Sequence, residues 1–107
     1  MVKEILTAAG FVENETFRET RFIKAPRETY AVYMDSFERR GADYKNLITD
    51  HTFTIELYSY IPDPDAEKRI ESSFDAYGIE FEKETRYWID EEQLYQVIYT
   101  FEYIESK

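Results

Sequence analysis

The sequence predicts a single α+β domain spanning residues 1–107, with an antiparallel sheet of four to five strands and two helices in the order α-β-β-β-α-β-β. Residues 79–103 alternate between apolar and polar side chains around Asp90-Glu91-Glu92, which is typical of a long β-hairpin with one buried face. A helical pattern bounded by capping residues comes directly before this hairpin. A chain of 107 residues is long enough for one domain with one modest core.

Two segments carry the signals of helices. A short amphipathic helix at the N-terminus is predicted to end at Gly10. Its apolar residues follow the spacing i, i+3, i+4, i+7: Val2, Ile5, Leu6 and Ala9. A second helix is predicted to begin with Asp63 as N-cap and Pro64 in its first turn, and to end at Gly78. We expect its apolar stripe to pack on the aromatic face of the hairpin; the stripe is Ala66, Ile70, Phe74 and Tyr77.

Three strands are predicted between the helices. Residues 16–23 have the composition of a strand but poor alternation, residues 30–37 read as a central strand with two apolar faces, and residues 47–61 alternate clearly. Residues 36–46 are polar and predict a long loop with Arg39 and Arg40 at its tip.

The first of these strands lies in the most basic stretch of the chain, which we call the basic strip: Arg18, Arg21, Lys24 and Arg27. Two interpretations stay open. The charges could belong to a solvated edge strand and discourage pairing with other sheets, or they could form a docking strip for an acidic partner.

The hairpin has a predicted register. A three-residue turn at 90–92 pairs Tyr87 with Tyr95 and Lys83 with Tyr99. The predicted core face then holds Ile79, Phe81, Tyr87, Tyr95, Val97, Tyr99, Phe101 and Tyr103. The remaining apolar residues of the hairpin fall together on its polar face: Trp88, Leu94 and Ile98. Either a helix or the N-terminal segment covers this cluster, or it forms a subunit interface.

Composition limits the classes of partner. The chain carries 13 Lys and Arg against 23 Asp and Glu, a net charge of −10, which disfavours binding to nucleic acids and to acidic membranes. It has no cysteine, so disulfides and thiolate metal sites are excluded. Without a signal-peptide pattern or an apolar run of ~20 residues, a protein kept in the cytoplasm is expected.

No catalytic arrangement is predicted. The chain has one histidine, His51, and no P-loop or nucleophile motif to accompany it. The row Glu80, Glu82 and Glu84 does not converge on a point, as a cation site would require. We therefore expect no enzyme activity, no cofactor and no metal.

Several segments between Tyr30 and Tyr103 carry a family resemblance: residues 30–33, 41–45, 53–58, 63–67, 79–83 and 94–99. They resemble a family of small proteins encoded among the head–tail joining and tail genes of tailed phages and prophages of Gram-positive bacteria. The resemblance implies a tail terminator or tail-completion protein that forms a homo-oligomeric ring at the end of the tail tube. It implies the tail tube protein and the head-completion protein as partners, and a location in the host cytoplasm during assembly and then in the virion.

A ring subunit needs two different surfaces that meet. The candidates are the cluster of Trp88, Leu94 and Ile98, and the basic strip; the loop with Arg39 and Arg40 is a candidate for docking on the tube. A head-completion or neck protein with the same fold would need similar surfaces. The alternative from another class is an acidic inhibitor or DNA mimic that binds a basic host protein. Its only support is the row of three glutamates, because strand side chains ~6.6–6.8 Å apart match a phosphate spacing of about 7 Å.

Overall fold

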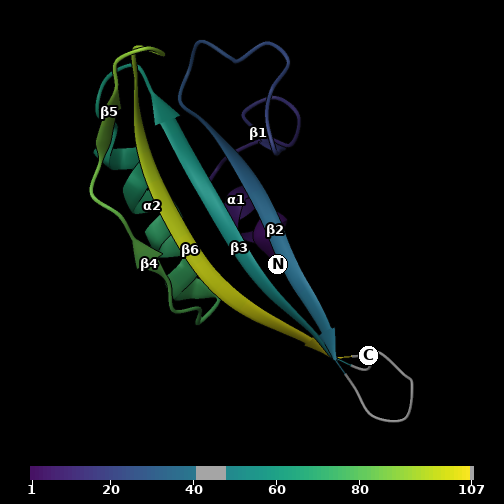
Figure 1. Cartoon of the computed structure of the whole chain (residues 1–107). Coiled ribbons are helices and arrows are strands. Elements are labelled where there is room, and N and C mark those ends of the chain that lie inside the picture. The colour runs from purple at the N-terminus through teal and green to yellow at the C-terminus, as the bar shows by residue number, and fades with distance from the viewer. Residues whose placement is uncertain (41–47, 107) are drawn as a thin grey trace.

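The computed structural model describes residues 1–40 and 48–106. Figure 1 shows the helices and the mixed sheet. The helices are α1 (Val2–Ala8) and α2 (Pro64–Ala76). The strands are β1 (Phe17–Glu19), β2 (Tyr30–Arg40), β3 (Ile48–Ser59), β4 (Glu82–Lys83), β5 (Tyr87–Ile89) and β6 (Leu94–Ser106). The sheet order is β1-β2-β3-β6-β4, and β5 also pairs with β6. The α+β class with two helices is therefore confirmed.

The sheet is not wholly antiparallel, so that part of the prediction is wrong. β2, β3 and β6 form the antiparallel centre, but β1 runs parallel to β2, with Phe17 opposite Ala31. Parallel strands need a connection that returns along the sheet, and residues 20–29 between β1 and β2 provide it. The Ala31 amide donates to the Thr16 carbonyl at 2.9 Å, and the Thr20 amide donates to the Tyr33 carbonyl at 2.8 Å.

Both helices form where capping residues predict them. Gly10 ends α1 with a φ of +95°, a conformation that favours glycine. The Asp63 carboxylate caps α2 by accepting the Ala66 amide at 3.0 Å, and it also accepts the Thr29 hydroxyl at 2.6 Å. The apolar stripe of α2 is buried as predicted except at Tyr77, which is exposed because it follows the last helical turn.

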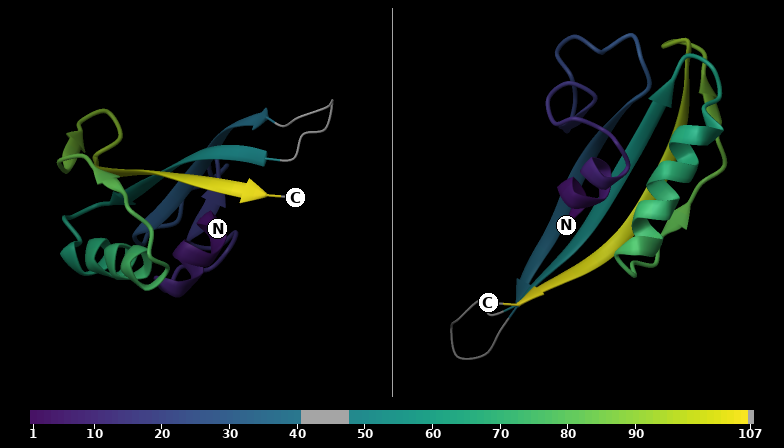
Figure 2. Two further views of the ribbon diagram at one scale, coloured as in Figure 1. Left: turned by 90° about the horizontal axis from the view of Figure 1, so that it is seen from below. Right: turned by 180° about the vertical axis from the view of Figure 1, so that it is seen from behind.

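The helices lie on one face of the sheet and cover only part of its length (Figure 2). Phe74 of α2 is fully buried, and its ring lies 4.6 Å from that of Phe81 and 5.1 Å from that of Phe101. This confirms that α2 packs on the aromatic face of the hairpin. A smaller cluster lies on the opposite face: Tyr30, Val32 and Leu94, with Phe22, Met34 and Tyr58 packed against them.

The hairpin register is correct at one end and wrong at the other. Lys83 lies opposite Tyr99 as predicted, but Tyr87 lies opposite Gln96 and not Tyr95. Ile89 pairs with Leu94, so the turn has four residues, 90–93, and Gln93 takes a φ of +56°. Between β4 and β5 the chain has one residue more than the part of β6 that lies opposite. This extra residue takes up the shift in register, and it divides the first half of the hairpin into two short strands. Tyr87 consequently points away from the core and is 63% exposed.

The three central strands continue past the helices. Residues 36–40, predicted as loop, extend β2 because each pairs with a residue of β3. We call this projection the arm: residues 36–40 of β2, 48–52 of β3 and 102–106 of β6. Figures 1 and 2 show these strand segments at the end of the molecule where the C-terminus lies.

Candidate interaction surfaces

The arm exposes apolar side chains on both faces. Phe37 lies at the height of His51 and Tyr103 on the face that carries the helices, and it is 52% exposed. Ile104 lies on the opposite face and is 58% exposed. Single exposed apolar residues are common on protein surfaces. Here both occur on a projection with no helix above it, which makes the arm a candidate contact surface.

His51 connects the three strands of the arm. Its Nδ1 lies 2.9 Å and 3.0 Å from the two carboxylate oxygens of Asp35 on β2, and its Nε2 lies 3.4 Å from Oε1 of Glu105 on β6. The ring stacks on Phe53 with a centroid distance of 5.0 Å. The hydrogen bond to Asp35 raises the pKa of His51; burial opposes this effect, and Glu105 adds to it.

This cluster holds strands together and does not resemble a reactive centre. Two carboxylates hydrogen-bond to one imidazole, which favours the protonated ring. Among residues 1–40 and 48–106, no group of three or more His, Asp or Glu side chains is arranged to hold a metal ion. The arrangement is therefore best understood as a cross-strand brace, through which the arm keeps its register.

The arm has two open edges. β1 pairs with β2 only from Ala31 to Tyr33, and β4 and β5 pair with β6 no further than Thr100. Within the described residues, no strand pairs with the outer side of β2 over 34–40, which we call the β2 edge, or of β6 over 101–106, which we call the β6 edge. Open strand edges are templates for pairing with another chain.

The basic strip lies at the other end of β2 from the arm. Arg18 is half-buried in β1, whereas Arg21, Lys24 and Arg27 are exposed in the segment between β1 and β2. Part of this segment borders a groove of about 420 Å³ on the face opposite the helices. Residues lining the groove include Arg21, Phe22, Tyr30, Tyr58, Ile89 and Glu92. β1 lies at the edge of the sheet, as the interpretation of the strip as a solvated edge strand expects.

The predicted apolar cluster does not exist as one surface. Leu94 is buried in the cluster against which Phe22 of the N-terminal segment packs, and Ile98 is half-buried on the same face. The changed register turns Trp88 to the face that carries the helices, where its ring lies 4.8 Å from Tyr95. Trp88 remains 38% exposed. An interface formed by Trp88, Leu94 and Ile98 together is therefore wrong.

The two arginines of the predicted loop are strand residues. Arg39 lies opposite Thr49 and Arg40 opposite Ile48, so they end β2 and do not occupy a loop tip. The rest of that predicted loop, residues 41–46, lies outside the described residues. The resemblance segment 41–45 falls there too.

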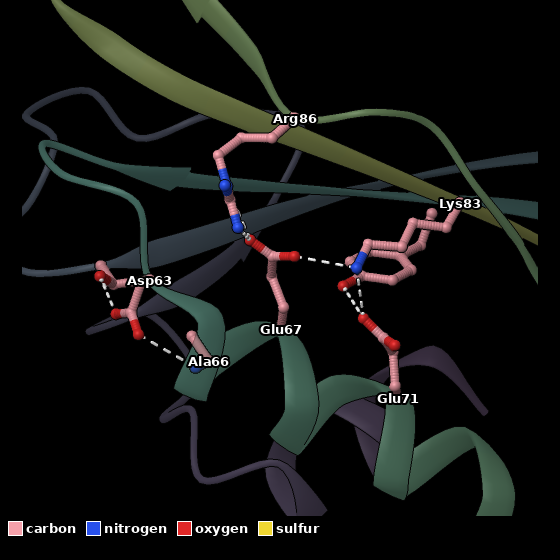
Figure 3. Close-up of polar contacts among 8 residues, drawn as sticks. Asp63, Ala66, Glu67, Glu71, Lys83 and Arg86 are labelled. Carbon is pink, nitrogen blue, oxygen red and sulfur yellow. Dashed lines mark hydrogen bonds and ion pairs between the residues drawn. The ribbon is translucent and has the colours of Figure 1, made fainter.

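Sequence reasoning missed a charged network between α2 and the hairpin (Figure 3). The buried Glu67 carboxylate accepts hydrogen bonds from Arg86 Nε at 2.9 Å and Nη2 at 2.6 Å. Lys83 Nζ bridges Glu67 at 2.9 Å and Glu71 at 2.8 Å, and the Tyr99 hydroxyl donates to Glu71 at 2.8 Å. The spacing of Glu67 and Glu71 on one helix face, four residues apart, is the signal that could have identified it.

The network has a structural role. Burial by itself raises the pKa of Glu67, but hydrogen bonds and charges from Lys83 and Arg86 outweigh it and lower the pKa overall. A carboxylate held ionised by two cations is a poor proton acceptor. The network fixes the irregular segment between β4 and β5 against α2.

Known proteins add no constraint on these surfaces. No family model matches the chain, and a search of curated proteins gave no match either. Neither of the helices in the described residues is long and apolar enough to cross a membrane. The choice of function therefore depends on the surfaces and on the resemblance of the sequence segments.

Proposed function

We propose that this protein is a structural component of a tailed phage or prophage, a tail terminator or head–tail joining protein that forms a ring at the end of the tail tube. The observation that carries the proposal is the arm, a three-stranded projection with open edges and exposed apolar residues on both faces. A domain that needed only its own core would not require a sheet that extends past its helices. The resemblance of the sequence segments supplies the phage context.

The surfaces suit assembly through unlike contacts. Ring closure requires that one surface of each copy meets a different surface of the next. The arm and the groove beside the basic strip lie at opposite ends of β2 and differ in composition. The arm offers its two unlike edges for contacts between copies, which leaves the groove for the tube or the head. A neck protein would use the same surfaces, so this proposal covers both positions in the virion.

The acidic-inhibitor alternative loses its geometric support. β4 contains only Glu82 and Lys83, so Glu80 and Glu84 lie outside a regular strand. The even spacing along a strand, on which the comparison with DNA phosphates depended, does not extend over the row. All three carboxylates are exposed, which solubility alone explains.

The deciding experiment is the mass of the protein in solution, measured by light scattering over a wide range of protein and salt concentrations. We expect a ring of several copies, or a monomer that assembles as its concentration rises. Electron microscopy of the assembled fraction should then show closed rings. A strict monomer at every concentration would overturn the proposal and favour the acidic inhibitor, which needs no copies of itself.

A further inference from the structure

We propose that neighbouring copies in the ring are joined by strand pairing, with the β6 edge of one copy lying parallel to the β2 edge of the next. The inference rests on the proposed ring and specifies the contact that forms it. The partner at each edge is a second copy of this chain.

Backbone groups on both edges point outward. The Ile98 carbonyl accepts the Glu84 amide at 2.9 Å on the outer side of β6. Because backbone groups of successive strand residues alternate in direction, those of Glu102 and Ile104 also face outward. On β2, the Tyr33 carbonyl faces β1, so the same alternation turns the backbone of Asp35 outward. Each edge therefore presents donors and acceptors in strand geometry.

The direction of pairing follows from the topology. β2 and β6 are both antiparallel to β3, so they run in the same direction within one copy. In a ring whose axis runs along these strands, every copy keeps that direction, and β6 of one copy then meets β2 of the next in parallel. A dimer related by a two-fold axis would instead pair like edges, β2 with β2 or β6 with β6. Ring closure removes every open arm edge, as barrel closure does in other sheets.

The side chains at equal heights are compatible across this contact. Through their partners on β3, Ser36 is level with Glu102, Phe37 with Tyr103 and Glu38 with Ile104. No two like charges fall opposite each other over these positions, and aromatic residues stand side by side. Pairing two β6 edges about a two-fold axis at Glu102 would instead bring the two Glu102 side chains opposite each other. Charge therefore disfavours this register of the β6–β6 alternative.

Cysteine cross-linking tests the contact directly, because the native chain has no cysteine. Ser36 and Glu102 are exposed and level on the face opposite the helices. The double variant Ser36→Cys/Glu102→Cys, oxidised to form disulfides, should give a ladder of dimers, trimers and larger species that ends at the ring size, because within one copy β3 keeps the two positions too far apart for a disulfide. Each single variant should stay monomeric on denaturing gels. An equal mixture of the two single variants should give dimers and nothing larger.

Two outcomes of this cross-linking would overturn the inference. Dimers formed by either single variant alone would show that like edges pair. A double variant that yields no ladder, although light scattering shows the ring, would place the contact elsewhere and leave the proposed function standing. A wild-type chain that never assembles would overturn both.

A backbone variant gives an independent readout. Ile104→Pro removes an outward amide, and proline is tolerated where a strand amide faces solvent. We expect it to abolish the ring while far-UV circular dichroism and the thermal midpoint of the monomer stay close to wild type. Ile104→Thr, which keeps the amide, should still form the ring. Ring formation by both variants would overturn the inference.

Discussion

The strands β2, β3 and β6 run through two different environments. Under the helices their inward side chains are completely buried, as Ile55 and Tyr99 are. In the arm the same strands have no helix above them, and Phe37, on the face that carries the helices, is 52% exposed. Backbone pairing between the strands thus continues beyond the part of the sheet where side chains are buried. The covered half supplies stability, and the arm, which contributes less to the core, is available for contacts.

The largest expected effect is in the covered half. Phe74→Ala removes a fully buried ring that contacts Phe81 and Phe101, so we expect a loss of roughly 3–5 kcal/mol in the free energy of unfolding. Urea unfolding followed by circular dichroism measures it. Tyr77→Ala, at an exposed position just past the same helix, is the matched control and should cost about 1 kcal/mol or less. Equal losses of unfolding free energy in the two variants would contradict the view that packing under the helices supplies the stability of the fold.

The buried carboxylate is the next strongest test. Glu67→Gln leaves Lys83 and Arg86 without their shared anion; because these side chains are 35% and 32% exposed, we discount the cost of breaking a fully buried pair to roughly 1–3 kcal/mol. The control is Asp65→Asn, which breaks an exposed pair with Arg69 on the same helix and should cost about 0.5 kcal/mol or less. Thermal unfolding compares the two variants. A loss of stability in Asp65→Asn as large as that in Glu67→Gln would contradict the stabilising role of the buried network.

The covered half should also be sensitive to acid. The pKa of Glu67 is lowered in the folded state. Its contribution to the free energy of unfolding is therefore complete above its unfolded pKa of about 4.3, and it is lost as the pH falls through the folded-state pKa. The pKa of Asp63 is lowered mainly by the Thr29 hydroxyl, with the same sign. Thermal midpoints measured from pH 7 to pH 3 should fall more steeply for wild type than for Glu67→Gln. If the thermal midpoints of the two proteins fell equally with pH, Glu67 would not be a cause of the acid sensitivity.

The arm should show the opposite pH dependence, with a smaller effect. The pKa of His51 is raised in the folded state. Its contribution to the free energy of unfolding is therefore complete below its unfolded pKa of about 6.5, and it is lost as the pH rises through the folded-state pKa. The ring protons of the single histidine give one NMR titration, and we expect its midpoint above 6.5. Asp35→Asn should move the midpoint down, because Asp35 is the main cause of the shift. A midpoint unchanged by Asp35→Asn would mean that the brace does not act through this hydrogen bond.

The smallest expected effect is at the surface of the arm. Ile104→Thr should change the free energy of unfolding of the monomer by no more than about 0.5 kcal/mol, because the side chain is largely exposed. Chemical denaturation at low protein concentration measures this value. A loss of more than 2 kcal/mol would show that the arm contributes to the core and would erase the contrast between the two halves.

Local signals predicted the covered half well. Asp63, Pro64 and Gly78 fixed α2, and the four apolar residues of α1 are buried as their spacing predicts. Alternation placed β3 within a few residues of its ends. These features are encoded in short stretches of sequence, so periodicity and capping were sufficient to find them.

The remaining features depend on partners distant in sequence. Residues 36–40 look like loop because they bury no apolar face, yet the ladder with β3 makes them strand. β1 is only three residues long, which is too short for its sequence pattern to indicate that it pairs in parallel with β2. An extra residue before Tyr87 shifted the register and separated Trp88 from Leu94. The candidate surface changed accordingly, from one apolar cluster to the edges of the arm.

The position of Trp88 has a spectroscopic consequence. It is the single tryptophan of the chain, and it lies beside the 90–93 turn, at the opposite end of β6 from the arm. Its emission will therefore follow the loss of packing around Tyr95 and will not respond directly to separation of strands in the arm. Fluorescence and the His51 resonance thus observe opposite ends of one sheet. Recording both during a single unfolding experiment would show whether the sheet unravels from the arm or melts as a unit.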